Sequence, residues 1–148
     1  MKAIKTILFA TDFSDSSNEA FSYALSFTRS FNARLFLLHV ISEPVDMRGF
    51  YVPHISFDSL ESEIIASAKK MLSDFCSVNL KESDDYAFDV VSGVPFQKII
   101  AVAEQEHADL IVVGTHGRGG LDHLLFGSNA EKIVRKSSVP VLTVRKND

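Results

Sequence analysis

The residues best suited to chemistry in this sequence lie at one junction, between a buried-looking strand and an amphipathic helix. The segment VVGTHGRGGLDHLLFGSNAEKIV has the spacing Gly114-x2-Gly117-x9-Gly127, followed directly by Ser128 and Asn129. Glycine permits positive φ and leaves room for a ligand to approach the backbone closely. The start of a helix offers free N–H groups and a positive dipole end, and both favour an anion. The junction therefore predicts a phosphate site whose two walls are a loop and a helix N-terminus.

Two cationic side chains, His116 and Arg118, lie in the same segment and could add positive charge to that site. The familiar nucleotide signatures are absent. No glycine precedes Lys-Ser or Lys-Thr at P-loop spacing, and Asp122 stands where a dinucleotide fingerprint has its third glycine. Spacing alone leaves a structural interpretation equally open, in which the glycines shape a long loop and Ser128 caps the helix.

A second polar loop, ATDFSDSS, follows the first apolar run. Asp12 at its start could hold a ligand or could cap the next helix, since Ser14, Asp15 and Ser16 are also available as caps. The segment from Ser16 to Glu19 matches a capping box, in which each side chain bonds the other residue's backbone N–H. We therefore expect Asp12 to be a ligand residue rather than the cap.

Short apolar runs alternate with amphipathic segments along the whole chain. This alternation predicts an α/β fold, with right-handed crossovers and a parallel sheet covered on both faces. In such sheets ligands bind beyond the carboxyl ends of the strands, where the strand order reverses. Both polar loops would rim one crevice if the first and fourth strands are neighbours. The expected strands are 4–10, 34–40, 86–93, 109–114 and 139–145, and the expected helices run from about 16 to 31, from about 58, from 95 and from 128.

Local signals refine these elements. Asn32 is a plausible left-handed stop for the first helix, and Pro95 suits the first turn of the third. The strand at 86–93 is less apolar than the others and is expected nearer a sheet edge. The helix from about 58 is expected to bury the stripe Leu60, Ile64, Ala68, Met71, Leu72 and Phe75.

The remaining candidates for chemistry have simpler interpretations. His39 lies between apolar strand residues and is expected to be packed or bonded to backbone rather than to a metal. Asp122 and His123 are residue types that can bind metals, but no further ligands follow at the spacing of a metal site. Both are therefore expected to be solvated loop residues. His54 is expected at the surface, and Cys76 is expected to pack in the core.

Composition limits the classes of protein to consider. The 148 residues fit one domain, 1–148. A single cysteine excludes an intrachain disulfide and favours a reduced, cytoplasmic setting. The formal net charge of −4 argues against sequence-independent binding to nucleic acid. No run approaches the roughly 20 apolar residues of a membrane helix, so we expect no membrane partner.

The glycine-serine motif after VVGTHG, together with ILFATDFSDSS near the start and SSVPVLTVR near the end, resembles the universal stress protein family and its ATP-binding branch. The likeness covers essentially the whole chain. It implies five parallel strands in the order 3-2-1-4-5, a homodimer, and an adenine nucleotide in the crevice. Because the strand at 139–145 would lie at a sheet edge, it is the expected dimer contact.

Carried over position by position, the resemblance implies a nucleotide site. Asp12 would lie beside the nucleoside, Val40 would line the adenine pocket through its backbone, and His116 and Arg118 lie in the motif's variable span. The other expected contacts are Gly114 and Thr115 near the ribose, and Gly117, Gly127, Ser128 and Asn129 at the phosphates.

Three functions are compatible with such a site. The first, which we favour, is a nucleotide-dependent sensor or regulator in stress response that binds ATP, ADP or AMP and hydrolyses ATP slowly or not at all. The second is a slow ATP hydrolase, in which Asp12 or Asp122 holds Mg²⁺ and Arg118 stabilises charge. The third is a dimeric stress protein with a vestigial site. The related ATP pyrophosphatases carry SGGxDS after the first strand. At that place this chain has ATDFSDSS, which lacks both glycines, so adenylation chemistry is not expected.

Overall fold

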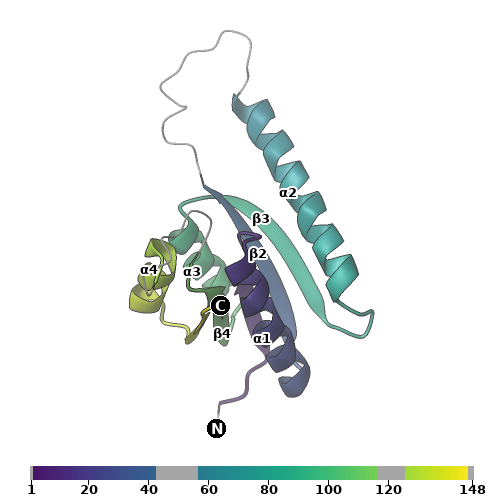
Figure 1. The fold of residues 1–148 in the computed structure, drawn as a ribbon, viewed down its shortest axis with the longest axis vertical. Coiled ribbons are helices and arrows are strands. Elements are labelled where there is room, and N and C mark those ends of the chain that lie inside the picture. Colours follow the sequence, from purple (N-terminus) through teal and green to yellow (C-terminus); the bar gives the residue numbers. More distant parts are fainter. Residues whose placement is uncertain (1, 43–56, 117–125, 147–148) are drawn as a thin grey trace.

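A computed structural model describes residues 2–42, 57–116 and 126–146 of the chain (Figure 1). Strands and helices alternate along these residues, as the sequence predicts. The elements in chain order are β1 (Thr6–Ala10), α1 (Asp15–Phe31), β2 (Arg34–Ser42), α2 (Phe57–Asn79), β3 (Tyr86–Gly93), α3 (Pro95–Gln105), β4 (Leu110–Gly114), α4 (Ser128–Lys136) and β5 (Val141–Val144).

The five strands form one parallel sheet in the order β3-β2-β1-β4-β5. This confirms the expected order, and with it the expectation that the first and fourth strands are neighbours. The strand at 86–93 lies at one edge and the last strand lies at the other. The chain leaves β1 towards β2 on one side and later returns to β4 on the other, so the strand order reverses at β1.

Helices cover both faces of this sheet (Figure 1). On one face, Ile7 and Phe9 of β1 pack in a core shared with α1 and α2. On the other face, Leu8 and Ala10 pack in a core shared with α3 and α4. Adjacent strand residues point to opposite faces, so an uninterrupted apolar strand such as β1 fits a sheet buried on both sides.

The start of α1 differs from the sequence prediction. The helix begins at Asp15, and Ser14 is its N-cap, because the Ser14 Oγ accepts a hydrogen bond from the Ser17 N–H at 3.3 Å. The capping box between Ser16 and Glu19 is therefore wrong. Ser16 is instead buried within the first turn. An N-cap residue precedes the helical backbone, and Ser16 already lies within it because α1 begins at Asp15.

Two other helix boundaries follow their local signals. Asn32 ends α1 in the left-handed region, with φ 52° and ψ 46°, and Asn is among the few residues that adopt this conformation readily. Pro95 occupies the first turn of α3, where its missing N–H costs no helical hydrogen bond. Both predictions are confirmed.

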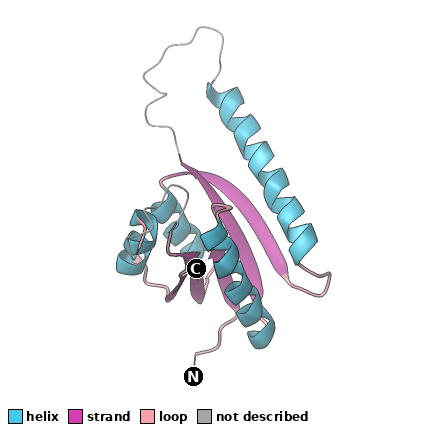
Figure 2. Cartoon of the chain, in the orientation of Figure 1, coloured by secondary structure: helices cyan, strands magenta, loops and turns pink. Residues whose placement is uncertain are grey.

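Helix α2 buries only part of its predicted apolar stripe. Ala68 and Leu72 are buried, together with Cys76, whose thiol pKa is raised to about 11 by burial. The packing interpretation of Cys76 is thus confirmed. Ile64 and Met71 instead remain 43% and 50% exposed. The N-terminal turns of α2 extend beyond the strands (Figure 2), and the side chains of Ile64 and Met71 border an open cavity instead of the core.

An ion pair ties the end of α1 to the turn that precedes β3. Arg29 donates two hydrogen bonds to Asp84, from Nε at 3.1 Å and from an Nη at 2.9 Å. The Asp84 carboxylate also accepts the Lys81 backbone N–H at 2.8 Å. These bonds, led by the one from Arg29, lower the Asp84 pKa to about 2. Bidentate pairs between arginine and a carboxylate have better geometry than most surface ion pairs.

The low pKa makes a prediction about acid stability. Since the folded-state pKa lies below the ordinary Asp value of about 3.9, ionised Asp84 favours the folded state at neutral pH, and this stabilisation is lost as the pH falls from about 4 to about 2. We expect Asp84→Asn to lower the melting temperature at pH 7 by about 3 °C. The deficit should shrink towards pH 2. Thermal unfolding followed by circular dichroism measures it, with Asp85→Asn as the charge-matched control; an equal effect of both variants would contradict the prediction.

Candidate functional site

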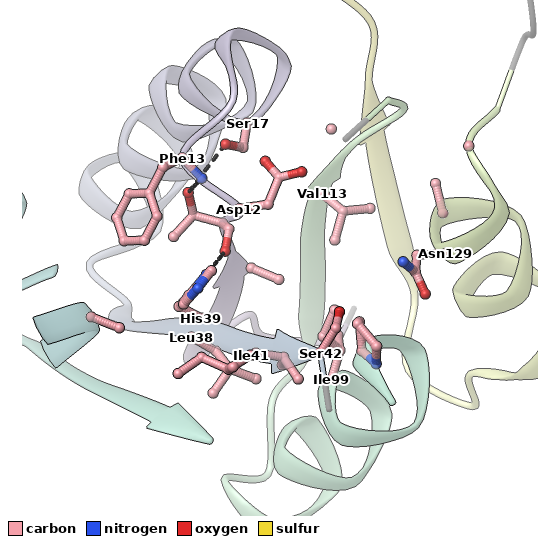
Figure 3. A pocket seen from close by; sticks show the side chains of 18 of the residues that line it. Asp12, Phe13, Ser17, Leu38, His39, Ile41, Ser42, Ile99, Val113 and Asn129 are labelled. Atoms are coloured by element: carbon pink, nitrogen blue, oxygen red, sulfur yellow. Dashed lines mark hydrogen bonds between the residues drawn. The ribbon is translucent and has the colours of Figure 1, made fainter. Parts of the chain in front are cut away.

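A cavity of about 980 Å³ opens at the carboxyl ends of β1, β2 and β4, where the strand order reverses (Figure 3). The loop between β1 and α1 forms one wall, the start of α4 forms another, and residues 60–71 of α2 form a third. Ligands of doubly wound sheets bind at this position, because the connections on the two sides of the reversal diverge and leave a crevice.

Most of the residues singled out in the sequence line this cavity. Three segments far apart in the chain supply them, so the fold alone brings them together. The lining includes Asp12, Val40, Gly114, Thr115, His116, Gly127, Ser128 and Asn129. Gly117 and Arg118 lie outside the described residues, as do His54, Asp122 and His123.

The wall between β4 and α4 is held by its own backbone. Buried Thr115 donates its N–H to the Val144 carbonyl of β5 at 3.0 Å and accepts the Gly127 N–H at 2.6 Å. The Thr115 hydroxyl also lies 3.0 Å from Nδ1 of His116. The end of β4 and the beginning of α4 are therefore fixed to each other across the glycine-rich connection.

The first turn of α4 offers donors at the cavity. Its N-cap is Gly127, which has no side chain that could accept hydrogen bonds from the first N–H groups of the helix. Ser128 and Asn129, the next two residues, are exposed and line the cavity. The acidic residue of this turn, Glu131, pairs with Arg135 at 3.3 Å. At the start of α1, by contrast, the N-cap is Ser14, whose hydroxyl accepts the Ser17 N–H. The α4 N-terminus thus has the properties of an anion site.

Gly114 has a structural role of its own. A Cβ atom at this position would lie 2.6 Å from Oγ of Ser16 and 2.9 Å from the Ser16 carbonyl carbon. Helix α1 therefore approaches the end of β4 so closely that no side chain fits between them. The close packing of α1 therefore explains why position 114 is a glycine, and no ligand is needed to explain it.

Asp12 is not the cap of α1, which was one of the two roles that the sequence left open for it. Its Oδ1 accepts the Ser14 N–H at 3.0 Å, in a turn that leads into the helix. The N-cap itself is Ser14, and Asp12 lines the cavity (Figure 3). A carboxylate that also stabilises its own turn keeps a defined position at the cavity wall.

Strand β2 continues beyond the end of β1. Ala10 pairs with Leu38, the last register pair of the two strands, while β2 runs on to Ser42. In a parallel ladder, alternate residues direct both backbone groups at the same neighbour. The Leu38 carbonyl accepts the Thr11 N–H on the β1 side, so the backbone N–H and C=O of Val40 face that side too. There they face the cavity rather than a strand.

His39 is bonded to backbone, as expected. Its Nδ1 lies 2.7 Å from the Thr11 carbonyl oxygen, and its ring packs against Phe13 with the ring centroids 4.8 Å apart (Figure 3). Phe13 has φ 62°, in the left-handed region that bulky residues rarely adopt. The sequence pattern predicts packing for His39 but does not indicate that this residue also lines the cavity.

The α2 wall was also missed. Leu60, Ile64 and Met71 line the cavity, with the polar residues Glu63 and Ser67 beside them. Leu60, Ile64 and Met71 belong to the same apolar stripe as Ala68 and Leu72. The periodicity of the sequence does not distinguish a residue that faces a cavity from one that faces the core. Pockets are commonly apolar with a few placed polar groups.

Neither a metal cluster nor a membrane span is found in the part of the chain that the structure describes. Among residues 2–42, 57–116 and 126–146, no three His, Cys, Asp or Glu residues are grouped to hold a metal ion. Within the same ranges, no helix has the length and apolarity needed to cross a membrane.

The sheet order and the position of the cavity define a Rossmann-like, doubly wound α/β protein with a cavity at the switch point. The sequence profile of the universal stress protein family matches residues 3–145. The chain therefore belongs to the universal stress protein family.

Individual relatives agree with this assignment. Universal stress protein A homolog 1 of Coxiella burnetii is 39% identical over 142 residues, covering 95% of both chains. Universal stress protein MJ0577 of Methanocaldococcus jannaschii is 30% identical over 160 residues, covering 97% of this chain and 96% of the relative. The solved structure of MJ0577 superimposes with a TM-score of 0.84 at 28% identity, covering 99% of each chain.

A further solved relative carries a ligand. It is a universal stress protein in complex with cAMP, with a TM-score of 0.63 at 26% identity, covering 97% of this chain and 98% of the other.

The contact at Gly114 predicts a large effect of a small change. We expect Gly114→Ala to lower the free energy of unfolding by about 1–3 kcal/mol, because the new methyl group overlaps α1. Since Ser16 backbone atoms contribute to the overlap, Ser16→Ala should not rescue the variant. Urea unfolding of the two single variants and the double variant measures this; full recovery in the double variant would show that only the Ser16 hydroxyl limits the space.

Proposed function

We propose that this universal stress protein binds an adenine nucleotide, with ATP as the principal ligand and ADP or AMP as alternatives, and acts as a nucleotide-dependent sensor or regulator in stress response. The observation that carries the proposal is the pairing of two features across one cavity. One is the α4 N-terminus, whose cap has no side chain. The other is the edge of β2 beyond the end of β1. The cAMP complex of a relative supports the same ligand class.

Each wall matches one part of the nucleotide. The C=O and N–H of Val40 suit the amine donor and ring-nitrogen acceptor that lie side by side on adenine, and the apolar α2 wall suits the flat base. Asp12 and the backbone at Gly114 and Thr115 are assigned to the nucleoside. The phosphate contacts we assign are Gly127, Ser128 and Asn129, with His116, Gly117 and Arg118 from the connecting segment.

Magnesium fits this site only together with the nucleotide. Mg²⁺ commonly binds one or two carboxylates plus substrate phosphates, rather than a cage made of protein alone. Asp12 is the carboxylate of the β1–α1 wall that could contact it. The ion would supply charge neutralisation of the phosphates, while the helix N-terminus and the loop backbone orient them.

A sensor fits the observed groups better than a fast hydrolase. Hydrolysis requires a positioned water and stabilisation of charge in the transition state. Asp12 accepts the Ser14 N–H and thus maintains a turn, which suits a binding residue better than a base that must move a proton. A slow Mg²⁺-dependent ATP hydrolase remains the alternative function, and a vestigial site is the other. The single, buried cysteine supports a reduced cytoplasmic setting.

The first test is to identify what the purified protein carries. We expect acid to release an adenine nucleotide from the wild type, detected by mass spectrometry, and added ATP at 100 times its dissociation constant to stabilise the fold by about 2.7 kcal/mol. Ser128→Ala combined with Asn129→Ala should weaken ATP binding about tenfold, through lost hydrogen bonds. Ser22→Ala, on the exposed surface of α1, is the matched control.

Each outcome selects one of the functions. A constant ATP to ADP ratio over hours supports the sensor, whereas steady conversion to ADP that requires Mg²⁺ supports the hydrolase. No released nucleotide and no stabilisation by millimolar ATP would refute nucleotide binding and favour the vestigial site.

We further propose that the protein forms a homodimer through the last strand, Val139–Arg145. Strand β5 lies at an edge of the sheet, and its backbone groups on that side are available to pair with a second chain. On the β4 side, the Pro140 carbonyl accepts the Ile111 N–H and the Val144 carbonyl accepts the Thr115 N–H. Alternate residues, including Thr143, therefore direct their backbone groups at the edge.

A proline at the edge tests this contact. Thr143→Pro removes an outward N–H while leaving the bonds to β4, which is the situation in which sheets tolerate proline. We expect this variant to stay folded and to become monomeric by light scattering, while Thr143→Ala, which keeps the N–H, stays dimeric. A dimer that persists in the folded proline variant would locate the interface elsewhere.

A further inference from the structure

We infer that His39 is a positioning residue of the cavity: its imidazole, protonated at Nδ1, holds the turn between β1 and α1 in the backbone arrangement that brings Asp12 to the cavity wall. The inference deepens the proposed function and rests on it, because the position of Asp12 matters there as a nucleotide contact.

The first step is the hydrogen bond from His39 to the turn. Nδ1 lies 2.7 Å from the Thr11 carbonyl oxygen. A carbonyl oxygen only accepts, so Nδ1 must carry the hydrogen whether the ring is neutral or charged. The Thr11 N–H donates to the Leu38 carbonyl at 2.9 Å. Both backbone groups of Thr11, the residue before Asp12, are therefore held by β2.

The second step is the residue on the other side of Asp12. Phe13 has φ 62°, and a bulky side chain stays in this region only when its surroundings stabilise it. The Phe13 N–H donates to the Thr11 hydroxyl at 2.9 Å, and that hydroxyl lies 3.1 Å from the Ser17 hydroxyl. The Phe13 ring rests on the imidazole, tilted by 48°.

One imidazole thus supports both neighbours of Asp12, through a hydrogen bond to Thr11 and a ring contact with Phe13 (Figure 3). Without the donor, the partly buried Thr11 carbonyl loses its partner, and the peptide between Thr11 and Asp12 can rotate. Phe13 can then relax to an ordinary negative φ, which would redirect the Asp12 carboxylate. The expected consequence is weaker binding of the nucleoside, although His39 itself is not among the nucleotide contacts assigned above.

Two substitutions separate the hydrogen bond from the bulk of the ring. His39→Leu keeps an apolar side chain against Phe13 but removes the donor. His39→Asn keeps a nitrogen donor at the same place along the side chain as Nδ1. Affinity for AMP and for ATP is measured by titration calorimetry at a temperature where all variants are folded, and urea unfolding reports stability separately.

We expect His39→Leu to weaken AMP and ATP binding about tenfold, as the loss of one buried hydrogen bond would, and His39→Asn to recover most of that loss. The ¹⁵N spectrum of histidine-labelled wild type should show the His39 proton on Nδ1. Wild-type affinity in His39→Leu with only lower stability, or equal losses in both variants, would overturn the inference. A wild type that binds no nucleotide would instead refute the proposed function, before any variant is compared.

Discussion

The central strand β1 is paired along both edges and buried on both faces. This single constraint places the cavity. Because all five strands are parallel, the connections must cross the sheet, and they do so over opposite faces on the two sides of β1. The loops that leave β1 and β4 therefore separate at the strand ends. The crevice is a necessary result of strand order, and the side chains only determine its chemistry.

Several residues at the cavity serve the fold and the site together. Gly114 is required by the close approach of α1, Asp12 stabilises its own turn, and Thr115 joins β4, β5 and the start of α4. A ligand would thus meet groups that are already fixed by packing and by backbone hydrogen bonds. Such preorganisation reduces the entropy lost on binding, and it suits recognition better than a reaction that needs a group to move.

The β2 edge and the α2 wall show how uneven element lengths create a site. Strand β2 runs four residues beyond its last pair with β1, and α2 extends past the strands (Figure 2). The unmatched part of each element borders the cavity. The strand contributes backbone polar groups, and the helix contributes apolar side chains. Both elements thus line the crevice that the strand order opens.

The sequence by itself determined the order of strands and helices, the parallel sheet, and the two loops that carry Asp12 and Gly127, because these depend on local periodicity and on turn chemistry. The order 3-2-1-4-5 came from the family resemblance. Only the tertiary structure decided that Ser14 rather than Ser16 caps α1, that Ile64 and Met71 face a cavity, and that His39 supports the turn at Asp12. The last two depend on contacts between segments distant in the chain, and such contacts leave no periodic signal in the sequence. The cap is a local hydrogen bond, but several neighbouring residues could have formed it, so the sequence did not select one.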